Sequence, residues 1–198
     1  SGNTIGFSGG SPGRFGILVS AGASATPSLS GNTILDDAPA SDIAVFSSVS
    51  EATSAVASAL EFTAGRATVV VSEAEFPTVA HVWLAQERRG AQVRWAPVHD
   101  GVIDPAEYDT RIDERTAVVS ACHAYYQNGF IQDIGRIAAR ARACGALSFV
   151  DAYQSLGAVP VDVRALDVDF LASGNLKFLM GIPGVAFLYV RPGLVETL

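Results

Sequence analysis

The sequence has a single lysine, although Lys and Arg together number 13 among its 198 residues. Its formal net charge is −7, and it has no run of basic residues. Nucleic acids and anionic membrane surfaces are bound by clustered positive charge, so we expect neither as a partner. The sequence also lacks an apolar run of the roughly 20 residues that span a bilayer, and no basic segment precedes an apolar one at its start. We therefore expect a cytoplasmic protein whose partners are small molecules or other proteins.

Cysteine is scarce as well. The two cysteines, Cys122 and Cys144, fall where a strand and a helix are expected to end, which is typical of buried thiols rather than of a disulfide framework. Hydrophobic residues make up 49% of the chain, enough for a sizeable core in one domain or in most of a larger one. The chain starts with Ser-Gly and no methionine, so we expect the natural protein to be longer.

A regular alternation of β-rich runs and helical patterns begins at residue 42. Residues 1–41 are rich in Gly, Ser, Ala, Asn and Pro and show no sustained period, so most of this segment is expected to be irregular. The expected strands are IAVF, ATVVVS, AQVRWAPV, TAVVSACHA and LSFVDA, with two more in VPVDVRALDVDFLASG and GVAFLYVRP; the expected helices are 50–62, 77–89, 105–112 and 132–143. Because these strands are continuously apolar, residues 42–198 are predicted to form a three-layer α/β fold with a doubly wound, mostly parallel sheet.

Polar side chains follow several of the expected strands, at the sheet edge where function gathers in such folds. These residues are Ser48, Glu73, His123 and Asp151. Asp151 is followed three residues later by Gln154, so a carboxylate and an amide can contact the same bound ring. The structural alternative for Asp151 is an N-cap of the following turn.

Small hydroxyl residues stand between a strand and a helix in FSSVSEATSAVA. Free backbone N–H groups and the positive end of a helix meet at such a point, which makes it suitable for an anion such as phosphate. Serine-rich N-caps without a ligand are common, so this stretch alone does not decide between the two interpretations.

The single lysine, Lys177, lies in the apolar stretch SGNLKFLMGIPG. Loss of hydration lowers the pKa of an ammonium group and yields the neutral amine that forms Schiff bases with carbonyl compounds. The alternative is a surface lysine that reaches solvent from an apolar turn. Together with the carboxylate and the anion site, a Schiff-base amine completes the set of groups that pyridoxal 5'-phosphate requires.

From about Ile43 to the C-terminus, the order and spacing of these motifs resemble the large domain of the class V aminotransferase family of fold-type I pyridoxal phosphate enzymes. This family includes cysteine desulfurases, kynureninase-like enzymes and isopenicillin N epimerase-like proteins. Its phosphate-binding Thr-Glu-Ala turn resembles SSVSEA, which implies phosphate contacts from Ser48, the Val49 N–H and Ser50. Its Glu-His stacking motif resembles EAEFPT, which implies that Phe76 stands over the cofactor ring.

Two further motifs carry the resemblance. HAYYQNGFIQDI, which begins at His123, is similar to the family's His-Val-x-Asn-x-x-Gly-x-x-Gln-Asp-Ile and implies that His123 contacts the cofactor. VDAYQSLGAVPVDV is similar to its Asp-x-x-Gln signature. This implies that Asp151 contacts the pyridinium nitrogen and Gln154 the ring oxygen.

The segment DFLASGNLKFLMGIPGVAFLYV resembles the family's Schiff-base segment, with Lys177 as the covalent anchor and Ser173 and Asn175 beside the cofactor. Leu176 stands where many members have histidine, and Tyr126 where an asparagine is frequent. No cysteine follows Lys177, where a desulfurase would carry its reactive thiol. These departures argue against the best-known cysteine desulfurases.

The resemblance implies a homodimer and an enzyme that acts on a small amino acid. We expect β-elimination, including carbon–sulfur lysis, with an aminotransferase or an epimerase as alternatives within the family. The family's C-terminal small domain is absent from this sequence, so an additional domain or a partner chain is expected to supply it. A non-catalytic scaffold is the alternative from another class, and a dehydrogenase is disfavoured because no G-x-G-x-x-G follows a strand and opens a helix.

Overall fold

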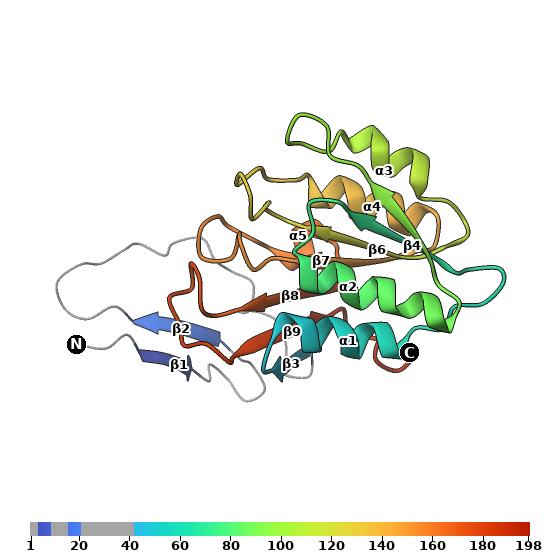
Figure 1. The fold of residues 1–198 in the computed structure, drawn as a ribbon. Helices are drawn as coiled ribbons and strands as arrows, with labels where there is room; N and C mark the ends of the chain where they lie inside the picture. Colours follow the sequence, from blue (N-terminus) through green and yellow to red (C-terminus); the bar gives the residue numbers. More distant parts are fainter. Residues whose placement is uncertain (1–3, 9–15, 21–41) are drawn as a thin grey trace.

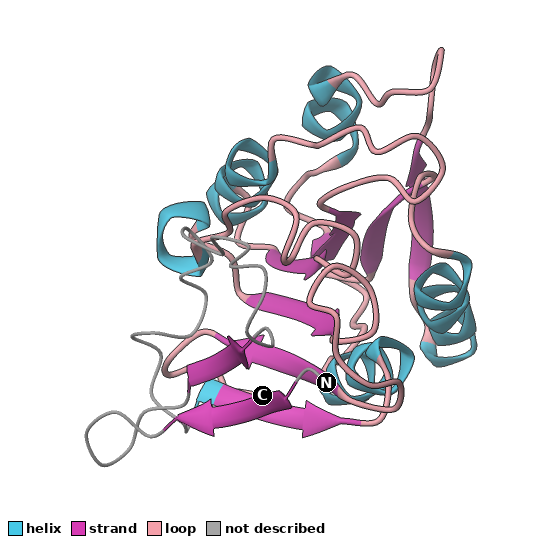
Figure 2. Ribbon diagram, turned by 90° about the vertical axis from the view of Figure 1, so that its left-hand side faces the viewer, coloured by secondary structure: helices cyan, strands magenta, loops and turns pink. Residues whose placement is uncertain are grey.

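A seven-stranded sheet runs through the protein, with helices on both of its faces (Figures 1 and 2). The structure is a computed structural model and describes residues 4–8, 16–20 and 42–198. The strands of this sheet, in the spatial order β3-β9-β8-β7-β6-β4-β5, are β3 (Ile43–Phe46), β4 (Thr68–Ser72), β5 (Gln92–Ala96), β6 (Thr116–Cys122), β7 (Leu147–Asp151), β8 (Phe170–Gly174) and β9 (Ala186–Val190).

The sheet is mostly parallel, as predicted. Strands β5, β4, β6, β7 and β8 pair in parallel, whereas β9 is antiparallel to both of its neighbours, β8 and β3. A parallel connection needs a crossover of a dozen or more residues, usually a helix. The connection between β8 and β9 covers only residues 175–185 and contains no helix, so the chain returns antiparallel. Lys177 lies in this connection.

The helices form two layers. Helices α1 (Val49–Ala59) and α2 (Pro77–Ala85) pack on one face, and α3 (Pro105–Arg111), α4 (Ile134–Ala143) and α5 (Val163–Leu166) on the other. All five residues of β4 are buried; Val69 and Val71 belong to the core under α1 and α2, and Val70 to the core under α3 and α4. Because successive side chains of a strand point to opposite faces, burial of both faces accounts for the continuous apolar runs in the sequence.

Most of the predicted elements are present, with small differences at their ends. The helix predicted over 77–89 consists of α2 and a 3-10 helix, η2 (Gln86–Arg89), so the chain stays helical to Arg89 but its last turn is tighter. The strand predicted in residues 159–174 is wrong in its first part: α5 lies there, capped by Asp162, whose side chain accepts from the N–H groups of Arg164 and Ala165, and only β8 at the end of the segment is extended. Cys122 and Cys144 are free and buried, at the end of β6 and the C-cap of α4.

The prediction that most of residues 1–41 is irregular falls largely outside the described residues. Within that segment the structure describes two antiparallel strands, β1 (Thr4–Ser8) and β2 (Gly16–Ser20). Among the described residues, no helix is both long and apolar enough to span a membrane.

Candidate functional site

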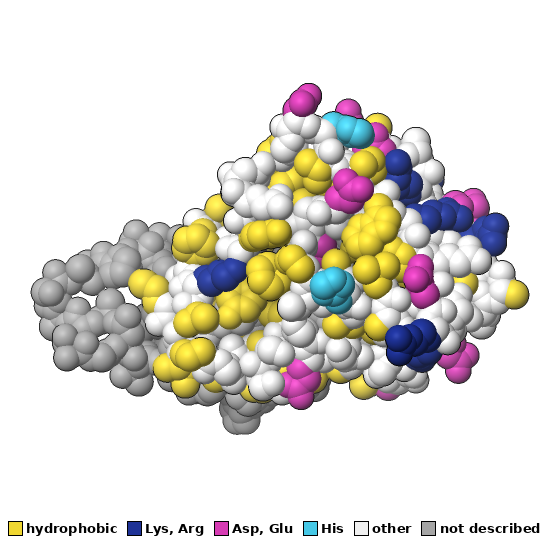
Figure 3. Space-filling model, viewed as in Figure 1, with side chains coloured by type: hydrophobic (Ala, Val, Ile, Leu, Met, Phe, Trp, Pro, Cys, Tyr) yellow, Lys and Arg dark blue, Asp and Glu magenta, His cyan; other side chains and the backbone are white. Residues whose placement is uncertain are grey.

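A cavity of about 280 Å³ lies at the carboxyl ends of β4, β6 and β7 and reaches the first turns of α1 and α2. This is the edge at which ligands bind in open α/β sheets. Figure 3 shows the face that carries α1 and α2, with apolar side chains gathered across its middle. The lining residues are Ser48, Val49, Ser50, Ala74, Phe76, Thr78, Val79, Cys122, Ala124, Tyr126, Asp151, Tyr153, Gln154, Leu176 and Lys177.

Lys177 enters this cavity between two aromatic rings. Its Nζ lies 4.8 Å from the ring centroid of Tyr153 and 5.3 Å from that of Phe76, both within the range of a cation–π contact. Desolvation lowers the pKa of Lys177, while the negative charge of Asp151 acts in the opposite direction. The direction of the shift favours a neutral amine, as the sequence argument requires.

Two glycines allow the lysine-bearing connection to come this close. A Cβ on Gly157 would lie 2.6 Å from the backbone carbonyl of Phe178, and Gly157 also has a φ of +87°. A Cβ on Gly174 would lie 2.5 Å from the ring of Tyr153. Since real Cβ atoms do not approach so closely, glycine at these positions lets Tyr153 and the backbone after Lys177 pack against the end of the sheet.

Asp151 is the buried acid of the cavity. Its side chain comes from the last residue of β7, and its Oδ1 accepts a hydrogen bond of 2.8 Å from the N–H of Tyr153. Burial raises the pKa of Asp151 to about 6, although the Tyr153 N–H and the Lys177 ammonium both favour its ionised form. The hydrogen bond to Tyr153 shows that Asp151 caps the following turn, as the structural alternative expected; its contact to a cofactor ring stays a prediction.

The serine-rich segment forms the start of α1, as predicted. Ser48 is the N-cap, and its side chain accepts a hydrogen bond of 3.1 Å from the N–H of Glu51. The hydroxyl of Ser50 donates to Oγ1 of Thr78 in the first turn of α2, over 2.9 Å. The N-termini of two helices therefore meet at one wall of the cavity, and both present positive dipole ends there.

The mouth of the cavity is aromatic. The Phe76 and Tyr126 rings form an edge-to-face pair with centroids 5.3 Å apart, and both side chains are about two-fifths exposed. Leu176 also lines the cavity and is half-exposed. Gln154 completes the predicted pair with Asp151, because both line the cavity.

Three predicted cofactor contacts are not among the residues that line the cavity: His123, Ser173 and Asn175. His123 is buried, and its Nδ1 lies 2.9 Å from the hydroxyl of Ser155. The hydroxyl of Ser173 donates to the carbonyl of Gly174, and the buried Oδ1 of Asn175 has no hydrogen-bond partner among the described residues. Their roles toward a cofactor stay predictions.

Sequence reasoning missed several residues of the cavity wall. Tyr153 stands two residues after Asp151, and an aromatic residue directly after a strand-end acid was a signal for it. Thr78 lies in the first turn of α2, and a signal for it was that α2 follows β4 just as α1 follows β3. No sequence pattern indicated that Cys122 would line the cavity, because its position depends on the pairing of β6 with β7.

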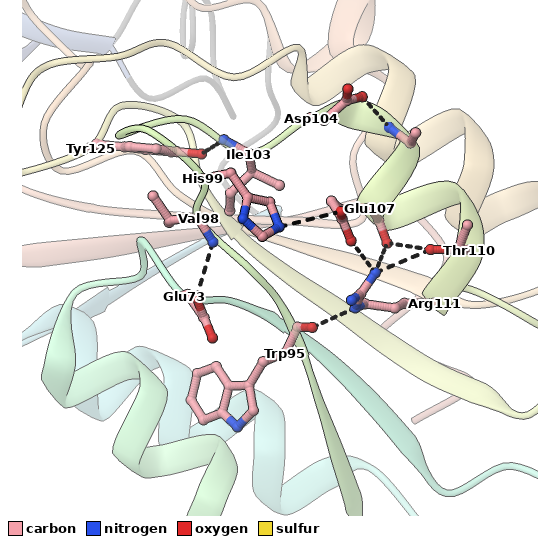
Figure 4. A network of polar contacts seen from close by, with 11 residues as sticks. Glu73, Trp95, Val98, His99, Ile103, Asp104, Glu107, Thr110, Arg111 and Tyr125 are labelled. Atoms are coloured by element: carbon pink, nitrogen blue, oxygen red, sulfur yellow. Dashed lines mark hydrogen bonds and ion pairs between the residues drawn. The ribbon is translucent and has the colours of Figure 1, made fainter.

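The loop between β5 and α3 is braced beside the cavity (Figure 4). Tyr125 is buried next to Tyr126, and its hydroxyl accepts a hydrogen bond of 3.1 Å from the N–H of Ile103. Arg111 pairs with Glu107 and donates from Nε to the carbonyl of Trp95 over 2.6 Å. The Tyr125 contact joins the loop to the segment that carries Tyr126, and the Arg111 contact with Trp95 joins α3 to the end of β5.

The donors and acceptors of the cavity fit pyridoxal 5'-phosphate. A lysine of lowered pKa, a buried carboxyl group and two helix N-termini line one space, as an aldehyde, a ring nitrogen and a phosphate require. In the part of the chain that the structure describes, no group of three or more His, Cys, Asp or Glu side chains is arranged to hold a metal ion.

Comparisons with known proteins agree with this geometry. An uncharacterized aminotransferase, YcbU, of Bacillus subtilis is 44% identical over 157 residues, which are 79% of this chain and 42% of that protein. A probable cysteine desulfurase of Methanothermobacter thermautotrophicus is 37% identical over 77% of this chain and 38% of its own length. The chain thus spans less than half the length of the curated relatives it matches.

Among solved structures, a cysteine desulfurase from Thermococcus onnurineus superimposes with a TM-score of 0.72 at 27% identity, over 79% of this chain and 40% of that one. A NifS-like protein gives the same TM-score at 26% identity. Class V aminotransferases and cysteine desulfurases are enzymes that use pyridoxal 5'-phosphate. The sequence model of class V aminotransferases matches residues 33–198, and the chain belongs to this family.

Proposed function

We propose that the protein acts on an amino acid with pyridoxal 5'-phosphate bound in this cavity and attached to Lys177. The observation that carries the proposal is that Lys177 and the buried Asp151 share one cavity with the N-termini of α1 and α2. These elements are far apart in the sequence, and a surface lysine or a simple N-cap would not need to bring them together.

When bound, pyridoxal phosphate supplies a carbonyl carbon that condenses with amines and a ring that withdraws electrons from the substrate. Lys177 would hold the cofactor through its Nζ, and the same amine would accept and return the α-proton of the substrate. The carboxylate of Asp151 would accept a hydrogen bond from the ring nitrogen and favour its protonated form. The N–H groups around Val49 and the hydroxyl of Ser50 would hold the phosphate.

The aromatic side chains exclude water from the reacting atoms. Phe76 and Tyr153 flank the Nζ of Lys177 in the structure, and either ring offers an apolar face to a bound ring. We place Phe76 over the cofactor.

Within the family we favour β-elimination, including carbon–sulfur cleavage, with aminotransfer or epimerisation as the alternatives. The probable cysteine desulfurase among the relatives and the two cysteine desulfurase-like folds support this preference. The cavity wall contains Cys122, but burial raises the pKa of its thiol well above the ordinary value, which opposes a thiolate nucleophile. We therefore propose sulfur release without a cysteine acceptor from the described residues.

We further propose a homodimer in the cytoplasm, with the small domain supplied by more polypeptide or by a partner chain. The relatives are more than twice as long as the matched region, which supports the additional domain. The two free, buried thiols support a reducing compartment.

The test is to incubate the purified chain with pyridoxal phosphate, remove the excess and record the visible spectrum before and after borohydride. We expect a retained band that borohydride removes, with a cofactor adduct that peptide mass mapping places on Lys177. Lys177→Ala should lose both the band and the adduct. A scaffold protein would retain no cofactor, and an adduct at another site would contradict the assignment of Lys177.

A further inference from the structure

A second buried carboxyl group, that of Glu75, lies beside Asp151 and has no role in the chemistry above. Glu75 is 4% exposed and Asp151 5%, so both are shielded from water. Asp151 acts electrostatically on Glu75, which shows that the two groups are near each other. The structure thus contains a pair of buried acids, one of which, Asp151, lines the proposed cofactor site.

The pairing of the strands brings these acids together. Ser120 in β6 is the register partner of Phe149 in β7, which lies two residues before Asp151. Side chains two residues apart share a face of a sheet, so Ser120 and Asp151 point to the same side. The hydroxyl of Ser120 donates to Oε2 of Glu75 over 3.1 Å, which holds the Glu75 carboxyl group on that side of the sheet.

The two acids have unequal partners. Asp151 accepts the N–H of Tyr153, and the charge of Lys177 favours its ionised form. Glu75 has the Ser120 hydroxyl at Oε2, whereas its buried Oε1 has no hydrogen-bond partner among the described residues. A negative charge on that oxygen would have neither a hydrogen-bond donor nor a positive group beside it among the described residues. A proton is therefore much more favourable on Glu75 than on Asp151.

The other titratable groups around Glu75 give its carboxylate no positive partner. They are the thiol of Cys122 and the hydroxyl of Tyr108, and both groups have pKa values raised well above ordinary by burial. Burial raises the pKa of Glu75 well above its ordinary value, and the charge of Asp151 raises it further. Asp151 ionises first, and Glu75, still neutral, then places no opposing charge on it.

We propose that Glu75 is a positioning residue that keeps its proton at neutral pH and so confines the negative charge of the pair to Asp151. The role of this arrangement rests on the proposed function, because the single charge on Asp151 is the one that a protonated ring nitrogen needs. If Glu75 ionised as well, repulsion would raise the pKa of Asp151 and return a proton to it.

The test is infrared difference spectroscopy on the cofactor-free chain at pH 8, which reports the C=O stretch of a protonated carboxyl group. We expect this band in the wild type and its loss in Glu75→Gln. The matched control is Glu73→Gln, because Glu73 is exposed and its Oε2 accepts a hydrogen bond from the N–H of Val98. The control should keep the band. Absence of the band from the wild type, or its loss in Asp151→Asn but not in Glu75→Gln, would overturn the proposal.

A second variant protects the test if Glu75→Gln does not fold. Ser120→Ala removes the hydrogen bond to Oε2 of Glu75 and should shift the band to higher frequency without abolishing it. An unshifted band would assign the proton to another group and contradict the proposal.

The consequence for the cofactor is measured separately, by titration with pyridoxal phosphate. Glu75→Gln imitates the neutral acid, so its dissociation constant should stay within about threefold of the wild type, whereas Asp151→Asn should weaken binding by about tenfold or more. Equal losses in both variants would show that Glu75 carries charge. Failure of the wild type to bind the cofactor would refute the proposed function, while the infrared result would still decide the protonation of Glu75.

Discussion

Replacing Asp151 with asparagine removes a carboxyl group that the folded chain buries, and the effect on stability depends on pH. The folded-state pKa of Asp151 is about 6, above the ordinary value of 3.8 that applies to the unfolded chain. Below pH 3.8 the group is protonated in both states and contributes nothing. As the pH rises toward 6, the unfolded chain releases the proton while the folded chain keeps it, so the free energy of unfolding falls.

The size of this loss follows from the two pKa values. The difference between 3.8 and about 6 corresponds to about 3 kcal/mol, which is fully present above pH 6 and then stays constant. Roughly half of this decrease in the free energy of unfolding develops below pH 5, and the rest develops between pH 5 and 8. We therefore expect cofactor-free Asp151→Asn to gain stability relative to the wild type as the pH rises, by about 1.5 kcal/mol between pH 5 and 8.

The assay is urea unfolding of both cofactor-free proteins at several pH values between 5 and 8, with Glu73→Gln as the exposed-carboxylate control. The difference in the free energy of unfolding between Asp151→Asn and the wild type should rise over this range and level off. A flat difference, or one that falls with pH, would refute the argument that burial opposes the charge of Asp151. Because Asp151 and Glu75 interact, the titration belongs to the pair, and the same series in Glu75→Gln separates the two groups.

Two further predictions concern packing. Gly157→Ala should lower the free energy of unfolding by about 2 kcal/mol or more and weaken cofactor retention, because its Cβ would lie 2.6 Å from the Phe178 carbonyl. The control is Gly129→Ala, which also has a positive φ but no atom within 4 Å of its Cβ. It should lower the free energy of unfolding by only about 1 kcal/mol, through backbone strain. Equal losses in urea unfolding would contradict the role of this contact. Trp83→Ala should lower the free energy of unfolding by about 3–5 kcal/mol, because Trp83 is fully buried against Phe149 with ring centroids 5.8 Å apart. A decrease of less than about 1 kcal/mol would contradict its place in the core.

Much of the fold was readable from local patterns. The apolar runs that became β4, β6 and β7 and the helical patterns between them predicted a three-layer, mostly parallel α/β sheet. The antiparallel direction of β9 was not predicted, because it depends on how the 175–185 connection returns along the sheet. The start of α1 was predicted within one residue, since Ser48 is a strong N-cap signal.

The candidate site, too, was predicted only in part from the sequence. Lys177, Asp151 and Gln154 were found by residue type and spacing, and all three line the cavity. Among the acids after β4, the sequence drew attention to Glu73, which directly follows the strand but is exposed. The buried acid is Glu75, which directly precedes Phe76 and so occupies the glutamate position of the Glu-His motif; the strand-end pattern alone did not show which of the two acids is buried.

By itself, the sequence determined the layer architecture, the single candidate amine and the acid and helix start that accompany it, because these follow from hydrophobic periodicity, capping chemistry and residue type. Only the tertiary structure decided which of these groups share a cavity and which carry charge. It seats Lys177 between Phe76 and Tyr153, and it buries Glu75 beside Asp151. Distances between side chains and the loss of hydration arise from the pairing of strands distant in sequence, which no local pattern encodes.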